Sequence, residues 1–209
     1  IFLLGDLFEV WVGDDALAEP GSFESRCCAL LAQAAREHAL YFLHGNRDFL
    51  IGEGFARASG VALLPDPTVL AFAGQRWLLS HGDALCLDDV EYQRFRALAR
   101  SPAWQHAFLA APLAQRRAQA RSMRAQSEAH KHASSWYADV DHPAALAWLQ
   151  AASAQALIHG HTHRPATHLL APGQLRHVLS DWDLDAMPPR AEVLRLTAKG
   201  LERLTLAPR

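Results

Sequence analysis

The stretch Ala156-Leu157-Ile158-His159-Gly160-His161-Thr162-His163 decides the fold, because an apolar run leads directly into glycine and two closely spaced histidines. The same pattern, an apolar run and then glycine beside a possible metal ligand, occurs three more times. The other three are residues 1–4 before Gly5-Asp6, 40–43 before His44-Gly45-Asn46 and 77–80 before His81-Gly82-Asp83. In open α/β sheets, polar residues just past the carboxyl ends of buried strands converge on one crevice. The four strand ends therefore predict one shared site.

The residues at these ends form a mixed set of metal donors, namely Asp6, Asn46, His81, His161 and His163. Each has an ordinary alternative: a lone histidine is more often a surface or satisfied core residue, and Asp or Asn beside glycine is common in turns. Their shared position after predicted strands favours a metal site. Carboxylate, amide oxygen and imidazole together suit manganese, iron or zinc better than calcium, whose sites are all oxygen.

Helical patterns lie between the predicted strands, at residues 23–38 and 54–59. Hairpins are predicted at 69–79 and 191–206. The alternation of strand and helix favours a layered α/β fold. We expect a single domain over residues 1–209.

Residues 98–137 break this rhythm and are predicted to be a helical cap inserted in the domain. Across residues 94–131 there are eight Lys or Arg and a single acid, Glu128. The simpler interpretation is a solvated, amphipathic surface helix pair. The position between two ligand-bearing strands favours a cap over the site, with a phosphate-bearing or anionic-surface partner.

The bulk composition excludes several classes of protein. The net charge of −2 over 209 residues gives no general attraction to nucleic acid or to anionic membranes. Three cysteines, two of them adjacent, form no disulfide framework or spaced zinc motif, which fits a reducing cytoplasm. No apolar run approaches the length of about 20 residues that crosses a bilayer. We therefore expect a soluble protein or one bound to a membrane surface.

The motifs resemble those of the calcineurin-like metallophosphoesterases, in the order Gly-Asp, Gly-Asn-Arg-Asp, His-Gly-Asp and Gly-His-Thr-His. The longer stretches around them are similar to the UDP-2,3-diacylglucosamine hydrolases. These stretches are residues 5–15, 44–50 and 158–165. The resemblance implies a four-layer fold, an α/β (by some schemes α+β) sandwich of two sheets between helices. It also implies hydrolysis of the pyrophosphate of UDP-2,3-diacylglucosamine to lipid X and UMP in lipid A synthesis.

The resemblance further implies two metal ions, which we expect to be Mn²⁺. Asp6 would bridge them, Asn46, His81 and His161 would complete one site, and His163 would belong to the other. The family's Asp-x-His motif is not found in this sequence. Because the chain starts abruptly in a predicted strand at Ile1, we expect that motif on a strand upstream, and the second site is incomplete as written.

Arg47 stands where many relatives carry a histidine. Arginine stays protonated and supplies only charge and hydrogen bonds, and a leaving phosphate needs no proton, so Arg47 favours pyrophosphate cleavage. A plain surface arginine is the alternative. The expected catalytic residues are Asp6, Asn46, Arg47, His81 and His161. The resemblance implies substrate contacts at Asn46, Arg47, Asp89, Tyr92, Arg124, Ser127, Lys131 and His161.

These residues also have ordinary alternatives. Asp89 would start a helix, Tyr92 would be a packed aromatic residue, and Arg124 and Ser127 would be solvated polar residues. Beyond Ser127 the sequence departs from the family pattern, so Lys131 is assigned a phosphate contact without a motif match. The family implies a cytoplasmic protein, peripheral on the inner face of the inner membrane, and we expect a monomer. Two rival hypotheses are a generic phosphodiesterase acting on soluble nucleotides and a non-catalytic, lipid-binding relative.

Overall fold

The computed structural model describes residues 1–133 and 138–206, with the side chains of 126–133 excepted. The chain forms two compact units. Unit 1 comprises Ile1–Pro65 and Leu87–Ala138, and unit 2 comprises Asp66–Cys86 and Asp139–Arg209. Each unit has its own sheet.

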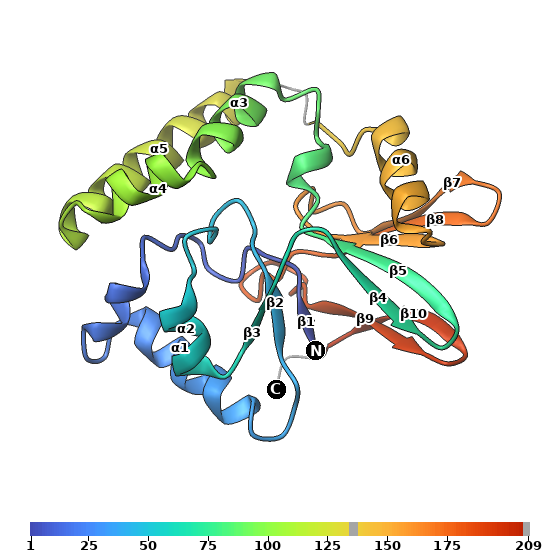
Figure 1. The fold of residues 1–209 in the computed structure, drawn as a ribbon, viewed down its shortest axis with the longest axis horizontal. Coiled ribbons are helices and arrows are strands. Elements are labelled where there is room, and N and C mark those ends of the chain that lie inside the picture. The colour runs from blue at the N-terminus through green and yellow to red at the C-terminus, as the bar shows by residue number, and fades with distance from the viewer. Residues whose placement is uncertain (134–137, 207–209) are drawn as a thin grey trace. The chain divides into compact units, whose positions relative to one another are not determined.

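Unit 1 contains a three-stranded parallel sheet in the order β1-β2-β3 (Figure 1). Its elements before the insert are β1 (Phe2–Leu3), η1 (Asp14–Ala18), α1 (Phe23–Ala34), β2 (Tyr41–Leu43), α2 (Glu53–Ser59) and β3 (Ala62–Leu64). A cluster of aromatic rings fills the space between sheet and helices, with Trp11 and Phe55 meeting edge to face at 5.5 Å. Burial of such rings is the main stabilising contribution of a small core.

The insert in unit 1 consists of three helices, α3 (Val90–Ala99), α4 (Pro102–Leu109) and α5 (Leu113–Ala133). The Asp89 carboxylate accepts from Tyr92 N at 3.0 Å and so starts α3, and Ser101 caps α4 in the same way. The predicted helices are therefore present in the described part of 98–137, the helical region starts already at Val90, and residues 134–137 lie outside the described residues. The limits of the cap as a domain stay a prediction.

Unit 2 contains a five-stranded mixed sheet in the order β4-β5-β6-β8-β7. Its elements are β4 (Thr68–Phe72), β5 (Gln75–Ser80), η2 (Asp83–Leu85), α6 (His142–Ala152), β6 (Ala156–His159), β7 (Ala166–Ala171), β8 (Gln174–Val178) and the separate hairpin β9 (Glu192–Thr197) and β10 (Gly200–Thr205). The central strands β5, β6 and β8 are parallel, and the two edge strands run antiparallel to them. Parallel central strands are buried on both faces, which accounts for the unbroken apolar run before His159.

The predicted α/β class, both hairpins and the helix at 54–59 are confirmed, whereas the helix predicted at 23–38 ends at Ala34. The four strands before the glycine motifs are also present, but they lie pairwise in two sheets, β1 with β2 and β5 with β6. Among the described helices, none is both long and apolar enough to cross a membrane.

Candidate active site

In unit 1, Asp6 lies where the loop after β1 touches the loop after β2. The Asp6 carboxylate accepts from the backbone N–H of Arg47 at 2.9 Å. A Cβ added at Gly45 would lie 2.2 Å from Asp6 Oδ1 and 2.3 Å from its backbone nitrogen. Glycine is therefore required at position 45, because any side chain there would displace the candidate ligand.

Asp48 holds these two loops together. Its side chain is fully buried, and it accepts from Leu7 N at 2.7 Å and from Gly45 N at 2.8 Å. A third, longer bond comes from Phe8 N at 3.4 Å. Hydrogen bonds to a buried carboxylate are stronger than neutral ones. Asp48 thus fixes the position of Asp6 relative to Asn46, a role that the sequence analysis did not assign.

Arg47 is not a plain surface arginine. Its guanidinium donates to Glu9 at 2.5 Å and lies 3.5 Å from the Asp6 carboxylate. Arg124 of α5 also bonds Glu9, through the carboxylate and, at 2.6 Å, through the backbone carbonyl. Partial burial of Glu9 opposes ionisation, but the two arginines outweigh it and lower the pKa of Glu9 below its usual value. Arg47 and Arg124 therefore share one anionic partner.

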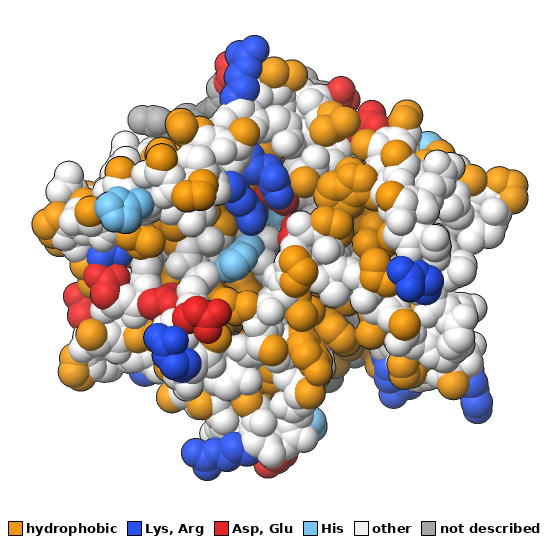
Figure 2. Space-filling model, viewed as in Figure 1, with side chains coloured by type: hydrophobic (Ala, Val, Ile, Leu, Met, Phe, Trp, Pro, Cys, Tyr) orange, Lys and Arg blue, Asp and Glu red, His pale blue; other side chains and the backbone are white. Residues whose placement is uncertain are grey.

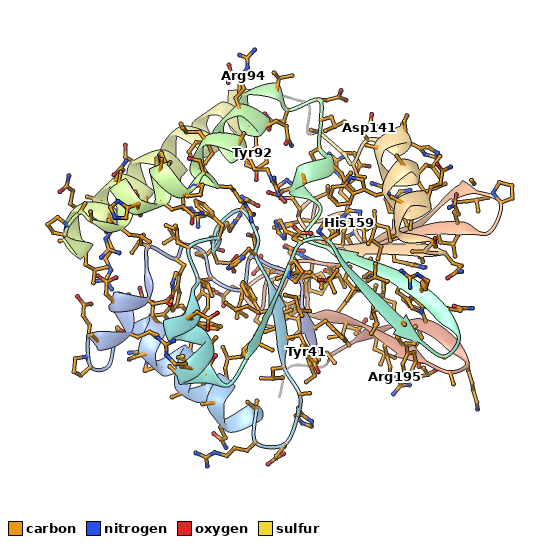
Figure 3. The ribbon with its side chains drawn as sticks, in the orientation of Figure 1. Tyr41, Tyr92, Arg94, Asp141, His159 and Arg195 are labelled. Carbon is orange, nitrogen blue, oxygen red and sulfur yellow. The ribbon has the colours of Figure 1, made fainter. Side chains whose placement is uncertain are left out.

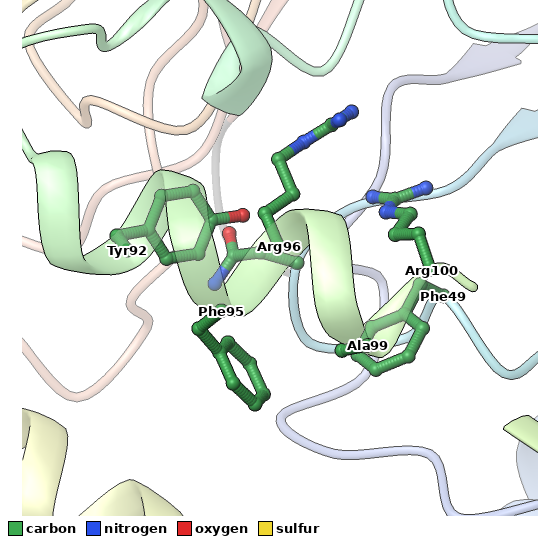
Figure 4. A pocket seen from close by; sticks show the side chains of 7 residues that line it. Phe49, Tyr92, Phe95, Arg96, Ala99 and Arg100 are labelled. Atoms are coloured by element: carbon green, nitrogen blue, oxygen red, sulfur yellow. The ribbon is translucent and has the colours of Figure 1, made fainter. Parts of the chain in front are cut away.

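A small pocket beside Asn46 is lined mainly by α3 (Figure 4). Tyr92, Arg96 and Arg100 project from the same side of this helix, and Phe49, in the loop after β2, lies beside Arg100. Tyr92 and Asn46 thus line the same pocket, and their contacts with substrate stay a prediction. Ser127 and Lys131 lie outside the described side chains.

In unit 2, His81 and His161 follow the parallel strands β5 and β6. Their rings lie edge to face with centroids 5.1 Å apart, and His81 is buried. The loops that carry them are joined by a bond from Gly160 N to the His81 carbonyl at 2.9 Å. Ser80 and His159, the last residues of β5 and β6, are paired in register. Both loops therefore start at the same position along the sheet. Two imidazoles are thereby presented side by side.

The backbone at three of the five candidate ligands is strained. His161 (φ 63°), His163 (φ 52°) and Asp6 (φ 54°) adopt the left-handed conformation, as do only Ala73 and Ser153 among the other described non-glycine residues. Ala73 lies in a hairpin turn and Ser153 ends α6, which are ordinary places for this conformation. Left-handed non-glycine residues cost roughly 1–3 kcal/mol and cluster at functional sites.

Behind the histidine pair, unit 2 buries further ionisable groups. Burial lowers the pKa of His159 to about 4, so its ring is neutral, and its Nδ1 pairs with the Gly160 carbonyl at 2.8 Å. A Cβ at Gly82 would lie 2.7 Å from that ring. Burial also raises the pKa of Asp66, whose carboxylate accepts from His81 N at 3.3 Å. Asp66 and His159 thus both lie against the loop that carries His81.

Comparison with known proteins identifies the family. A family model described as calcineurin-like phosphoesterase matches residues 1–165. A UDP-2,3-diacylglucosamine hydrolase of Chromobacterium violaceum is 50% identical, and the match covers 87% of this chain and 76% of that protein. The chain belongs to the UDP-2,3-diacylglucosamine hydrolase family of calcineurin-like phosphoesterases.

Two further proteins with the name UDP-2,3-diacylglucosamine hydrolase agree. The protein of Aromatoleum aromaticum is 48% identical over 89% of this chain and 77% of its own length. That of Escherichia fergusonii is 42% identical over 97% of this chain and 83% of its own. The resemblance stated from the motifs is thereby confirmed, and with it the calcineurin-like fold.

Membership of a metallophosphoesterase family implies that the chain uses divalent metal. The residues present fit this requirement. Unit 1 offers a carboxylate and an amide oxygen on adjoining loops, and unit 2 offers two imidazoles with ring centroids 5.1 Å apart. Oxygen and imidazole donors of this kind suit first-row divalent metals.

The basic insert of this family member is partly neutralised within unit 1. Arg116 is buried and bonds Asp15 and the Val12 carbonyl, and Arg117 bonds Glu19 at 2.7 Å. On the face drawn in Figure 2, basic side chains lie beside acidic ones in several places. At least three of the eight cations, the two above and Arg124, therefore hold α5 against the preceding part of the unit.

Proposed function

We propose that the chain hydrolyses the pyrophosphate bond of UDP-2,3-diacylglucosamine in lipid A biosynthesis, releasing UMP and lipid X. The observation that carries this proposal is the identity of 42–50%, over most of the chain, to relatives that bear this name. The arrangement of donors in each unit supports it, because both sets follow strand ends and are held by close contacts.

We assign Asp6, Asn46, His81, His161 and His163 as the residues that would hold two Mn²⁺ ions, with the Asp6 carboxylate contributing to both sites. When bound, the two ions would lower the pKa of the attacking water and neutralise charge on the pyrophosphate. Within unit 1, Asp48 and Gly45 set the position of the Asp6 carboxylate.

Arg47 is assigned to the phosphoryl oxygens. A guanidinium is a hydrogen-bond donor and not a proton-transfer group, so Arg47 would stabilise developing negative charge without acting as an acid. Its contact with Asp6 at 3.5 Å places this charge beside a proposed metal ligand. A leaving phosphate is a weak base, which agrees with a residue that cannot act as an acid. His161 and His81 would help to stabilise charge on the phosphoryl oxygens.

Substrate contacts are proposed for Asn46, Arg47, Asp89, Tyr92, Arg124, Ser127, Lys131 and His161. Tyr92 has the clearest support, because it lines the pocket beside Asn46. Asp89 caps α3, so its contribution to binding is separable from its structural role only by a variant such as Asp89→Asn.

The test measures UMP release by the full-length gene product with UDP-2,3-diacylglucosamine and Mn²⁺. In ¹⁸O-labelled water, the label is expected in UMP, since attack is proposed at the uridine-side phosphorus. Asp6→Ala and His161→Ala are each expected to lower kcat at least about 10³-fold. Label found in lipid X would reject the proposed point of attack, and normal turnover by either variant would reject its assigned role.

A matched substrate comparison addresses the generic phosphodiesterase. If the acylated sugar is the substrate, bis(p-nitrophenyl) phosphate and soluble nucleotides will be turned over far more slowly. The opposite preference would support the rival function.

We also propose that the chain is a monomer on the inner face of the inner membrane. Support comes from apolar side chains exposed on the insert, including Val90, Leu98 and Leu109, with the exposed Arg94 on the same helix as Leu98. Flotation with phosphatidylglycerol vesicles tests this binding, and Leu98→Glu should reduce it. Light scattering tests the monomer. Absence of flotation at low salt would contradict the membrane proposal.

A further inference from the structure

Arg100 ends α3 and reaches the loop that carries Asn46. Its Nη2 donates to the Gly45 carbonyl at 3.0 Å, and its guanidinium carbon lies 5.5 Å from the centre of the Phe49 ring. The two contacts stand on either side of Asn46-Arg47-Asp48. The side chain is half-buried, so both contacts are shielded in part from water.

Gly45 is thereby held through both of its backbone polar groups. Its N–H donates to Asp48 at 2.8 Å, and its carbonyl accepts from Arg100 at 3.0 Å. Gly45 lies directly against Asp6. The orientation of the Gly45 peptide groups therefore sets the position of the next residue, Asn46. The next residue, Arg47, then donates its N–H to Asp6.

The chemistry of Arg100 is specific to arginine. A planar guanidinium donates to a carbonyl and stacks on an aromatic ring at the same time, whereas the ammonium of lysine is a compact, strongly hydrated charge. A cation at the last turn of a helix is also favoured by the helix dipole. Arg100 therefore suits this position better than lysine does.

The contact also joins two functional elements. Tyr92, a proposed substrate contact, lies two turns before Arg100 on the same side of α3 (Figure 4). Tyr92 and Arg100 belong to one helix, so the bond from Arg100 to Gly45 links the helix that carries Tyr92 to the loop that carries Asn46.

We infer that Arg100 is a positioning residue: it holds the Gly45 carbonyl, and through it Asn46 and Arg47, in the geometry that the site requires. The inference deepens the proposed function, since Asn46 and Arg47 are the groups it positions. No contact between Arg100 and substrate is involved.

The first measurement is hydrogen exchange in the metal-free protein. In Arg100→Ala the amides of residues 45–48 are expected to exchange about tenfold faster, because one of the two restraints on Gly45 is lost. Arg94→Ala is the matched control, since Arg94 is exposed and lies on the side of α3 opposite Tyr92 (Figure 3). It should leave these amides unchanged.

The second measurement is Mn²⁺ affinity, followed by the electron paramagnetic resonance of free Mn²⁺. Loss of a group that orients a ligand typically costs about 10–100-fold in metal affinity, so Arg100→Ala should weaken binding about tenfold. Arg100→Lys keeps a cation and a long stem and should recover less than half of this loss. Ethylguanidinium at millimolar concentration should partly restore Arg100→Ala.

Unchanged exchange and unchanged Mn²⁺ affinity in a folded Arg100→Ala protein would overturn the inference. If that variant does not fold, Arg100→Lys decides in its place by the same two measurements. Neither measurement needs turnover, so a wild-type protein that releases no UMP would reject the proposed function and leave the test of Arg100 intact.

Discussion

The two units hold their candidate ligands by different means. In unit 1, side chains from distant segments fix the loops, with Asp48, Arg47 and Arg100 all bonding backbone or carboxylate groups around Asp6. In unit 2, paired parallel strands and left-handed backbone conformations present His161 beside His81. Asp6 in unit 1 is also left-handed, but unit 1 adds charged side chains from distant segments, whereas unit 2 relies on paired strands and backbone geometry. Substitutions should affect the two units differently.

The largest effect is expected from Gly45→Ala in unit 1. The added methyl group would overlap Asp6, so the loops must separate, and we expect a loss of about 3 kcal/mol in the free energy of unfolding with loss of UMP release. Urea denaturation provides the measurement. Gly52→Ala is the control, because its Cβ would meet only the Asp14 carboxylate at 3.0 Å. Equal stability of the two variants would show that Gly45 does not define the contact.

A smaller loss is expected from Asp139→Asn in unit 2. Arg176 is almost fully buried and donates to both Asp139 oxygens, at 2.8 and 3.1 Å. Removing the carboxylate charge should lower the free energy of unfolding by roughly 2 kcal/mol.

The Asp139 pair also predicts a pH dependence. The bonds from Arg176 lower the pKa of Asp139 from 3.8 to about 2. A lowered carboxylate pKa stabilises the fold above the unfolded value, and this contribution disappears as the pH falls from about 4 to about 2. The stability difference between wild type and Asp139→Asn, measured by urea titration at several pH values, should therefore shrink over that range. A difference that grows there would contradict the assignment.

His163→Gly should separate strain from metal binding. Glycine removes the cost of the left-handed conformation but loses more backbone entropy on folding, so the metal-free protein should gain about 0.5 kcal/mol of stability. Mn²⁺ binding should weaken at least about tenfold. Thermal unfolding with EDTA and with Mn²⁺ gives both quantities. A clear destabilisation in EDTA would mean that His163 contributes packing instead.

The smallest effect is expected from Glu9→Gln in unit 1. The Glu9 side chain is 72% exposed, and exposed ion pairs contribute less than about 1 kcal/mol. The stability difference from wild type should fall further in 0.5 M salt because the charges are screened. KM is the more sensitive readout, since Arg47 and Arg124 lose their common partner. A loss of more than about 2 kcal/mol in the free energy of unfolding that does not depend on salt would contradict this interpretation.

Local sequence patterns predicted the strand ends well, because an apolar run ending in glycine is encoded in neighbouring residues, whereas the metal donors at these ends stay a prediction. The roles of Asp48 and Arg100 were not predicted. Their backbone partners lie 41 and 55 positions away in the chain, and such contacts have no local signature. Asp48 belongs to the motif Gly45-Asn46-Arg47-Asp48, and this membership was the one sequence signal that could have indicated its role. The division into two units was likewise not encoded in any linker-like segment.

The charge of the insert was predicted correctly, but its neutralisation was not. The acids that pair with α5 lie in residues 9–24, far from the basic residues 94–131 in the sequence. Counting the charges of one segment alone therefore overestimates how many cations are left to bind an anionic partner. Arg94 and Arg121 are exposed and are better candidates for anionic surfaces.

The ion pairs of α5 with residues 9–24 have a consequence for engineering. A helical cap transferred from a relative would bring its own pattern of cations, while the recipient would keep acids matched to the original. Chimaeric proteins should therefore exchange residues 9–24 together with residues 87–138, so that the cations and their acidic partners come from the same protein. The requirement is strongest for the buried Arg116, because a recipient protein without Asp15 would bury an uncompensated positive charge.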